Sequence, residues 1–155
     1  MSSCDLEIFV DGACKGNPGA AAIGVVIFEN QKKIKEVSRT IGEATNNIAE
    51  YKALLCALEE AKLLKASKIK IYTDSELMFY QFSGRYQVKS EHLKIFFDQA
   101  QKLAKEFKSV EIKNIPREKN KEADQLATQA LKNKQVKMVA PTSFSVGEES
   151  PSSKG

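Results

Sequence analysis

The sequence has no tryptophan, a single histidine at His92, and only three cysteines. Cys4, Cys14 and Cys56 are odd in number and show no Cys-x-x-Cys spacing, which favours reduced thiols over a disulfide framework or a zinc site. His92 lies at a lysine-rich helix start, so we interpret it as a surface residue, and a Cys–His nucleophilic pair has no local support. No glycine-rich stretch ends in Gly-Lys-Ser/Thr, which excludes a Walker phosphate loop.

Long apolar runs are also missing. None approaches the roughly 18 residues of a membrane span, and the start MSSCDLEIFV lacks the charged-then-apolar order of a signal peptide. We therefore expect a cytoplasmic protein without a membrane partner. The net charge is +4, with the basic excess in the second part of the chain. This excess permits a polyanionic partner but does not establish one, because solubility explains it equally well.

The apolar periodicity and the turn residues predict a mixed α/β fold. Three strands joined by short turns indicate an antiparallel meander, because such turns are too short for a crossover. A helix–strand alternation follows, which predicts a five-stranded mixed sheet covered by helices. The predicted strands span residues 6–10, 22–28, 33–41, 68–73 and 110–115, and the predicted helices span 45–64, 76–82, 91–107 and 121–131.

The end of the chain differs from the rest in composition. Beyond Asn133 the sequence is rich in Ser, Pro and Gly and has no apolar periodicity. We therefore expect one folded domain over residues 1–133, long enough to bury a core, and a flexible tail over 134–155.

Four carboxylates occupy comparable places in these elements. Asp11 ends the first predicted strand, Asp74 ends the fourth, and Glu50 and Asp124 lie near helix starts. Each has a structural explanation as a cap or a partner of the helix dipole, although Asp11 gains nothing from burial at the end of an apolar strand. If all four meet, their repulsion requires a cation. Oxygen ligands suit Mg²⁺ or Mn²⁺, and two such ions can clamp a phosphoryl displacement; spacing alone does not prove that the acids meet.

Four motifs, taken together and in order, resemble those of type-one ribonuclease H. They are DGACKGNPG at 11–19, TNNIAE at 45–50, YTDS at 72–75 and REKNKEAD at 117–124. The resemblance covers about residues 5–132 and indicates a short form of the family, without its basic handle or its loop histidine. The ribonuclease H-like fold has a five-stranded mixed sheet, three antiparallel strands and then two parallel ones, flanked by helices, which agrees with the predicted elements.

The resemblance implies an endonuclease that hydrolyses the RNA strand of RNA–DNA hybrids and leaves 5′-phosphate and 3′-hydroxyl ends. It implies two Mg²⁺ ions, with Mn²⁺ as a substitute. Asp11 would bridge the ions, Asp124 would complete the ion that activates the attacking water, and Glu50 and Asp74 would hold the ion at the leaving 3′ oxygen. We expect a monomer, and the sequence leaves open whether double-stranded RNA is also cleaved.

The resemblance also implies a set of substrate contacts. The glycine-rich turn and the TNN segment match positions that read ribose 2′-hydroxyls in the minor groove and a phosphate of the DNA strand. For Asn46 and Asn47, helix capping remains an alternative. The expected substrate-binding residues are Gly12, Ala13, Cys14, Asn17, Thr45, Asn47, Ser75 and Lys89.

Three departures from the family pattern bear on these expectations. The loop IPREKNKEAD has no histidine, so Arg117 or Glu118 would replace it. The segment SGRYQVKSEHL offers only Arg85 and Lys89 where other members carry a long basic handle with tryptophans. Glu43 stands where a basic residue is common, which weakens the phosphate-pocket assignment. The alternative to an enzyme is a catalytically inactive nucleic-acid-binding module of the same fold; transposase and resolvase cores match the motifs less well.

Overall fold

The computed structural model describes residues 4–139, and their side chains as far as Asn133. The elements, in chain order, are β1 Asp5–Gly16, β2 Gly19–Glu29, β3 Lys32–Ala44, α1 Asn46–Leu63, β4 Lys68–Thr73, α2 Glu76–Phe82, α3 Glu91–Ala104, β5 Ser109–Asn114, the 3₁₀ helix η1 Arg117–Lys119, and α4 Lys121–Val139. Within this range no helix combines the length and the hydropathy needed to cross a membrane.

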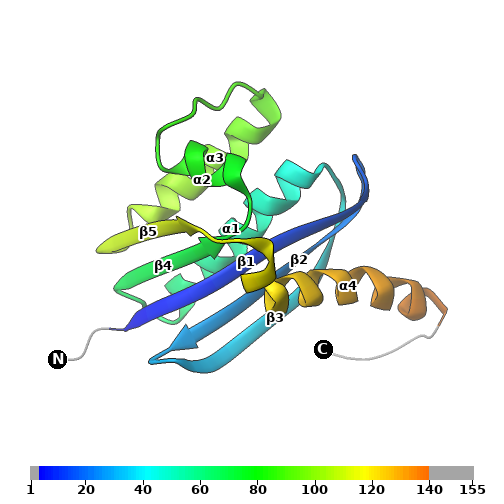
Figure 1. Ribbon diagram of the computed structural model, residues 1–155, viewed down its shortest axis with the longest axis horizontal. Helices are drawn as coiled ribbons and strands as arrows, with labels where there is room; N and C mark the ends of the chain where they lie inside the picture. The colour runs from blue at the N-terminus through cyan, green and yellow to red at the C-terminus, as the bar shows by residue number, and fades with distance from the viewer. Residues whose placement is uncertain (1–3, 140–155) are drawn as a thin grey trace.

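The strands form one five-stranded sheet in the order β3-β2-β1-β4-β5 (Figure 1). Strand β1 pairs antiparallel with β2, and β2 pairs antiparallel with β3. Strand β1 also pairs parallel with β4, which pairs parallel with β5. The predicted mixed sheet, three antiparallel strands followed by two parallel ones, is therefore confirmed. Helix α4 crosses the sheet over β1, β2 and β3, while α1 covers the other face and α3 packs against α1.

The main core lies between the sheet and α1. Thr45 caps α1 by accepting a hydrogen bond from the N–H of Ile48 at 3.2 Å, as its place before the helix predicts. Leu54 and Leu58 of α1 are fully buried against Ile8 and Ile71 of the sheet. Burying each of these side chains stabilises the fold by about 1.5–3 kcal/mol, so the position of α1 against β1 is firmly determined.

Several element ends differ from the predicted ones. Strand β1 continues through Asp11 to Gly16, because its antiparallel pairing with β2 goes on after its parallel pairing with β4 has stopped at Phe9. The expectation that Asp11 ends the strand is therefore wrong. Strand β3 likewise runs on to Ala44, and α3 ends at Ala104, before the expected end at 107.

Helix α4 also extends past its predicted end at 131 and reaches Val139. Residues 132–139 contain neither proline nor glycine, so no residue in this stretch interrupts the backbone hydrogen bonding. The first residues of the expected tail, 134–139, thus belong to the helix, and its remainder, 140–155, lies outside the described residues.

Candidate active site

Asp11 and Asp74 meet where two parallel strands separate. Asp11 is only 5% exposed and lies just beyond Phe9, the last residue of β1 that pairs with β4. Asp74 directly follows β4 and does not cap the next helix, because the cap of α2 is Ser75, which accepts a hydrogen bond from the N–H of Met78 at 3.2 Å. The capping explanation for Asp74 is therefore wrong.

Gly12 allows Glu50 to reach these two acids. A Cβ atom at Gly12 would lie 2.5 Å from the carbonyl carbon of Ala49 and 2.7 Å from the nitrogen of Glu50. Only glycine permits this contact between the backbones of β1 and α1. The N–H of Gly12 donates a hydrogen bond to Oε1 of Glu50 at 3.1 Å. Carboxylate oxygens of Asp11, Glu50 and Asp74 consequently lie within 4.8 Å of one another.

Gly24 allows the backbone of α4 to approach β2 closely, as Gly12 does for α1 and β1, and so determines where Asp124 lies. It is the register partner of Asp11 on β2, so both residues face α4. A Cβ at Gly24 would collide with the carbonyl oxygen of Ala123 and would lie 2.8 Å from the nitrogen of Ala127. This close approach brings the carboxyl of Asp124 near that of Asp11, close enough to raise the pKa of Asp11. A glycine inside an otherwise apolar strand is the sequence signal for such an approach.

The pKa values of two of these acids are strongly raised. Burial, followed by the charges of Glu50 and Asp74, raises the pKa of Asp11 to about 9, and Asp124 acts in the same direction. Burial and the charge of Asp74 raise the pKa of Glu50 to about 8, although the N–H of Gly12 and the charge of Arg117 oppose this. Both groups therefore hold protons at neutral pH unless a cation replaces them.

The donor set fits a hard divalent cation. All of the ligating atoms are carboxylate oxygens, which Mg²⁺ and Mn²⁺ prefer over nitrogen or sulfur ligands. A cation would also remove the repulsion that raises the two pKa values. Asp11, Glu50 and Asp74 are therefore the residues that could hold a metal together, and Asp124 lies beside Asp11 without belonging to this group of three.

Asn120 is a residue of the site that the sequence interpretation missed. It is 1% exposed, and its Nδ2 donates to the carbonyl oxygen of Val10 at 2.8 Å and to Oδ2 of Asp74 at 2.9 Å. Its backbone carbonyl accepts from the N–H of Asp124 at 3.1 Å. Its place just before a helix carrying an acid suggests a cap, but nothing in the sequence indicates the contact with Asp74.

The residues of the glycine-rich turn and the TNN segment lie together at one edge of the sheet. Oδ1 of Asn17 accepts a hydrogen bond from the N–H of Asn46 at 2.9 Å. Asn17 and Asn47 are exposed. The cap of α1 is Thr45 rather than either asparagine, so the capping alternative for Asn46 and Asn47 is wrong. Cys14 is half-buried, and its thiol donates to the carbonyl oxygen of Ala44 at 2.9 Å.

The remaining residues are Ala13 and Lys89, which were predicted to bind substrate, and the two candidates for the loop histidine. Ala13 is half-buried against the cluster of Ala22 and Ala130, and Lys89 is exposed. Of the two candidate substitutes for a loop histidine, Arg117 lies beside the site, with Nη2 3.9 Å from Oδ1 of Asp124 and a side chain 80% exposed. Glu118 is exposed on η1.

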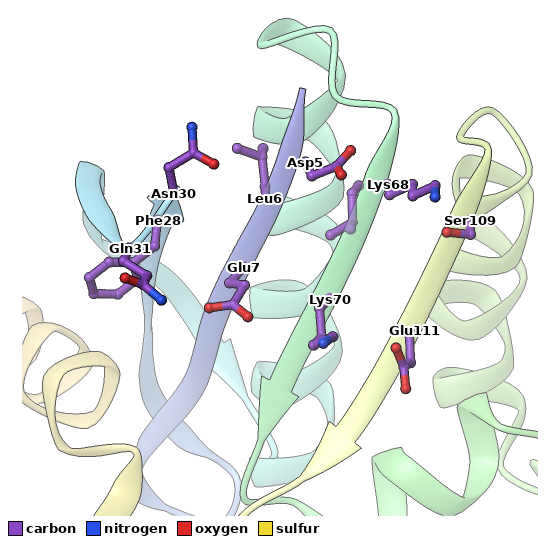
Figure 2. Close-up of a pocket in the computed structure, with 11 residues that line it drawn as sticks. Asp5, Leu6, Glu7, Phe28, Asn30, Gln31, Lys68, Lys70, Ser109 and Glu111 are labelled. Carbon is purple, nitrogen blue, oxygen red and sulfur yellow. The ribbon is translucent and has the colours of Figure 1, made fainter. Parts of the chain in front are cut away.

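A separate pocket lies at the opposite end of the strands. It has a volume of about 370 Å³ and is lined by the first residues of three strands, including Asp5, Lys68 and Ser109. Figure 2 shows these side chains at the starts of β1, β4 and β5, with both kinds of charge mixed. Asp11 is six positions after Asp5 along β1, which is roughly 20 Å of extended chain. The pocket is therefore not part of the acidic site.

The mixed sheet and the acids that gather where β1 and β4 separate define a ribonuclease H-like α/β protein with a carboxylate site. The family model described as "Reverse transcriptase-like" matches residues 9–130. The chain is 39% identical over 126 residues to the bifunctional protein Rv2228c of Mycobacterium tuberculosis, covering 80% of this chain and 35% of that protein. It is 40% identical over 127 residues to ribonuclease HI of Halobacterium salinarum, covering 81% and 64%. The chain thus spans between about a third and two thirds of the length of these relatives.

Two solved structures have the same fold. Ribonuclease H1 from the halophilic archaeon Halobacterium salinarum matches with a TM-score of 0.81 and 37% identity, covering 83% of this chain and 98% of that one. LC11-RNase H1 in complex with RNA/DNA hybrid matches with a TM-score of 0.80 and 38% identity, covering 84% and 99%. The chain belongs to the type-one ribonuclease H family of nucleases, as a short member.

Proposed function

We propose that the protein is an endoribonuclease that hydrolyses the RNA strand of RNA–DNA hybrids with two divalent ions, Mg²⁺ or its substitute Mn²⁺. The observation that carries the proposal is the meeting of Asp11, Glu50 and Asp74 within 4.8 Å, beside Asp124. The hybrid as substrate is supported by 38% identity to LC11-RNase H1, which was solved with RNA/DNA hybrid. The inactive binding module is disfavoured, because buried carboxylates that repel one another destabilise a protein that has no use for a cation.

Each residue has a defined task in this proposal. The four acids hold the ions; when bound, these lower the pKa of the attacking water and neutralise charge on the phosphate. The N–H of Gly12 fixes Glu50 by donating to its Oε1 at 3.1 Å. Arg117, 3.9 Å from Asp124, adds positive charge where other members carry a histidine, with Glu118 as the second candidate. The water loses a proton as its oxygen joins phosphorus, the bond from phosphorus to the 3′ oxygen breaks, and this leaving oxygen takes up a proton, giving a 5′-phosphate and a 3′-hydroxyl.

The substrate contacts are proposed for the sheet edge next to the acids. The hydrogen bond between Asn17 and the N–H of Asn46, at 2.9 Å, holds the side chain of Asn17 against the start of α1, the helix that also carries the exposed Asn47. Such polar groups can read ribose 2′-hydroxyls in a minor groove. The half-buried side chains of Ala13 and Cys14 leave the backbone of 12–14 as the contacting group. Thr45, Ser75 and Lys89 complete the proposed set.

Three further expectations stay predictions. They are a monomeric state, a cytoplasmic location, and a division between a catalytic domain, predicted over 1–133, and a C-terminal tail, predicted over 134–155, of which 134–139 continue α4. Whether double-stranded RNA is a second substrate is an outcome of the experiment below.

The experiment is cleavage of a hybrid labelled at the RNA 5′ end, with Mg²⁺, with Mn²⁺ and with EDTA. We expect cuts inside the RNA strand with either metal, none with EDTA, and none by Asp11→Asn. Duplexes of DNA and of RNA run in parallel define the substrate class. If the protein binds hybrid and DNA duplex alike and cuts neither with either metal, the proposal is wrong and the binding module stands.

A further inference from the structure

Asn120 joins the three elements that carry Asp11, Asp74 and Asp124. Its Nδ2 donates to the carbonyl oxygen of Val10, the residue before Asp11, and to Oδ2 of Asp74. Its backbone carbonyl accepts from the N–H of Asp124 in the first turn of α4. A single buried residue therefore connects β1 and the end of β4 through its side chain, and the start of α4 through its backbone, at the place where the acids meet.

The hydrogen bonds of Asn120 determine the orientation of its amide. The reversed orientation would place Oδ1 against the carbonyl oxygen of Val10 and the carboxylate of Asp74, with no hydrogen between the three oxygens. The amide nitrogen must therefore face both acceptors. Oδ1 is then left buried without a partner among the described residues, and such an oxygen is destabilising. An asparagine with this drawback is poorly explained by stability alone.

The contact with Val10 compensates for a gap in the sheet. Pairing between β1 and β4 stops at Phe9 and Tyr72, because β4 ends at Thr73. The carbonyl of Val10 is one residue beyond the last pair, and Asn120 supplies its donor. The second hydrogen of the same amide is then directed at Asp74, which ties that carboxylate to β1, the strand that carries Asp11.

We propose that Asn120 is a positioning residue, which holds the carboxylate of Asp74 at the spacing from Asp11 that metal binding requires. The inference rests on the proposed function and adds to it a residue that need not touch ion or substrate itself. It predicts a defect in metal affinity and in kcat, because Asp74 is released. It predicts a small effect on the KM for hybrid, because the proposed contact surface around Asn17 and Asn47 is unchanged.

The test compares Asn120→Ala with Asn114→Ala as a matched control. Nδ2 of Asn114 also donates to the end of β4, to the carbonyl oxygen of Thr73 at 3.1 Å, but it makes no bond to a carboxylate. Mn²⁺ affinity is measured by calorimetry on the protein without substrate. The melting temperature is measured in EDTA, and kcat and KM are measured with labelled hybrid. Asn120→Ser, which retains one donor, is measured as well and takes the place of Asn120→Ala if that variant does not fold.

We expect Asn120→Ala to weaken Mn²⁺ binding and to lower kcat by about 10-fold or more, as loss of a group that orients a metal ligand typically does. The KM of Asn120→Ala for hybrid should differ from that of wild type by less than about threefold. The Mn²⁺ affinity and kcat of Asn120→Ser should lie between those of Asn120→Ala and wild type, and the control Asn114→Ala should match wild type in both quantities. The inference is overturned if Asn120→Ala only lowers the melting temperature, with affinity and kcat unchanged, or if Asn114→Ala shows the same losses. If wild type cleaves no hybrid, the proposed function fails instead, while the calorimetric comparison still tests the role of Asn120.

Discussion

Replacing Asp11 by asparagine is expected to stabilise the metal-free protein. The substitution keeps the side-chain shape and removes a group whose ionisation is opposed by burial and by its acidic neighbours. In the unfolded chain this carboxyl ionises near pH 4, whereas in the folded protein its pKa is about 9. Between these values the folded state binds one more proton than the unfolded state, so the free energy of unfolding falls as the pH rises through the window.

The size of the effect follows from this proton. Each retained proton lowers the free energy of unfolding by about 1.4 kcal/mol per pH unit. Between pH 5 and pH 7, Asp11 alone therefore lowers the free energy of unfolding of wild type by roughly 2.7 kcal/mol. The free energy of unfolding of the variant does not fall by this amount, because asparagine does not ionise. Glu50, with a pKa of about 8, also lowers the free energy of unfolding as the pH rises, and it does so in wild type and in the variant. At pH 7 we expect Asp11→Asn to be more stable than wild type by about 1–3 kcal/mol.

The assay is urea unfolding in EDTA, followed by circular dichroism at pH 5, 6, 7 and 8. Asp98→Asn is the control, because Asp98 is an exposed acid on α3 that lies 3.9 Å from Lys94, and it should follow the wild-type curve. Added Mg²⁺ should stabilise wild type by mass action and the variant far less. Parallel pH curves, or a variant less stable than wild type at pH 7, would refute the reasoning and make Asp11 a structural hydrogen-bonding residue.

Other substitutions test separate parts of the site. Gly24→Ala should lower the free energy of unfolding by about 1–3 kcal/mol through overpacking against α4, measured by urea unfolding, and should slow hybrid cleavage. Arg117→Ala should slow cleavage with a melting temperature within about 4 °C of wild type, because so exposed an ion pair contributes little stability; an unchanged rate would remove Arg117 from the mechanism. Asn47→Ala should reduce hybrid cleavage far more than salt-sensitive binding to DNA duplex, and equal losses in both assays would contradict a 2′-hydroxyl contact. Removing residues 140–155 should leave the cleavage rate and the melting temperature unchanged, and a drop of more than about 4 °C, or roughly 1 kcal/mol, would show that they dock.

The element types and the candidate acids could be predicted from the sequence because their signals are local. The alternation of apolar residues indicates the strand at 68–73, and Thr45 before an apolar stripe indicates the start of α1. The positions of Asp11 and Asp74 after apolar strand residues, and the motifs around them, indicated the candidate metal site. The predicted span of 76–82 matches α2 residue for residue.

How these elements approach one another was decided by the tertiary structure. Asp11 does not end its strand, because the length of β1 depends on pairing with β2 and not on its own residues. The contacts at Gly12 and Gly24 depend on backbones of α1 and α4 that are distant in sequence. Asn120 is separated from its acceptor Val10 by 110 positions. A local pattern states which face a residue prefers, but whether two carboxylates lie close enough to share a cation depends on packing between distant segments, which only the folded chain determines.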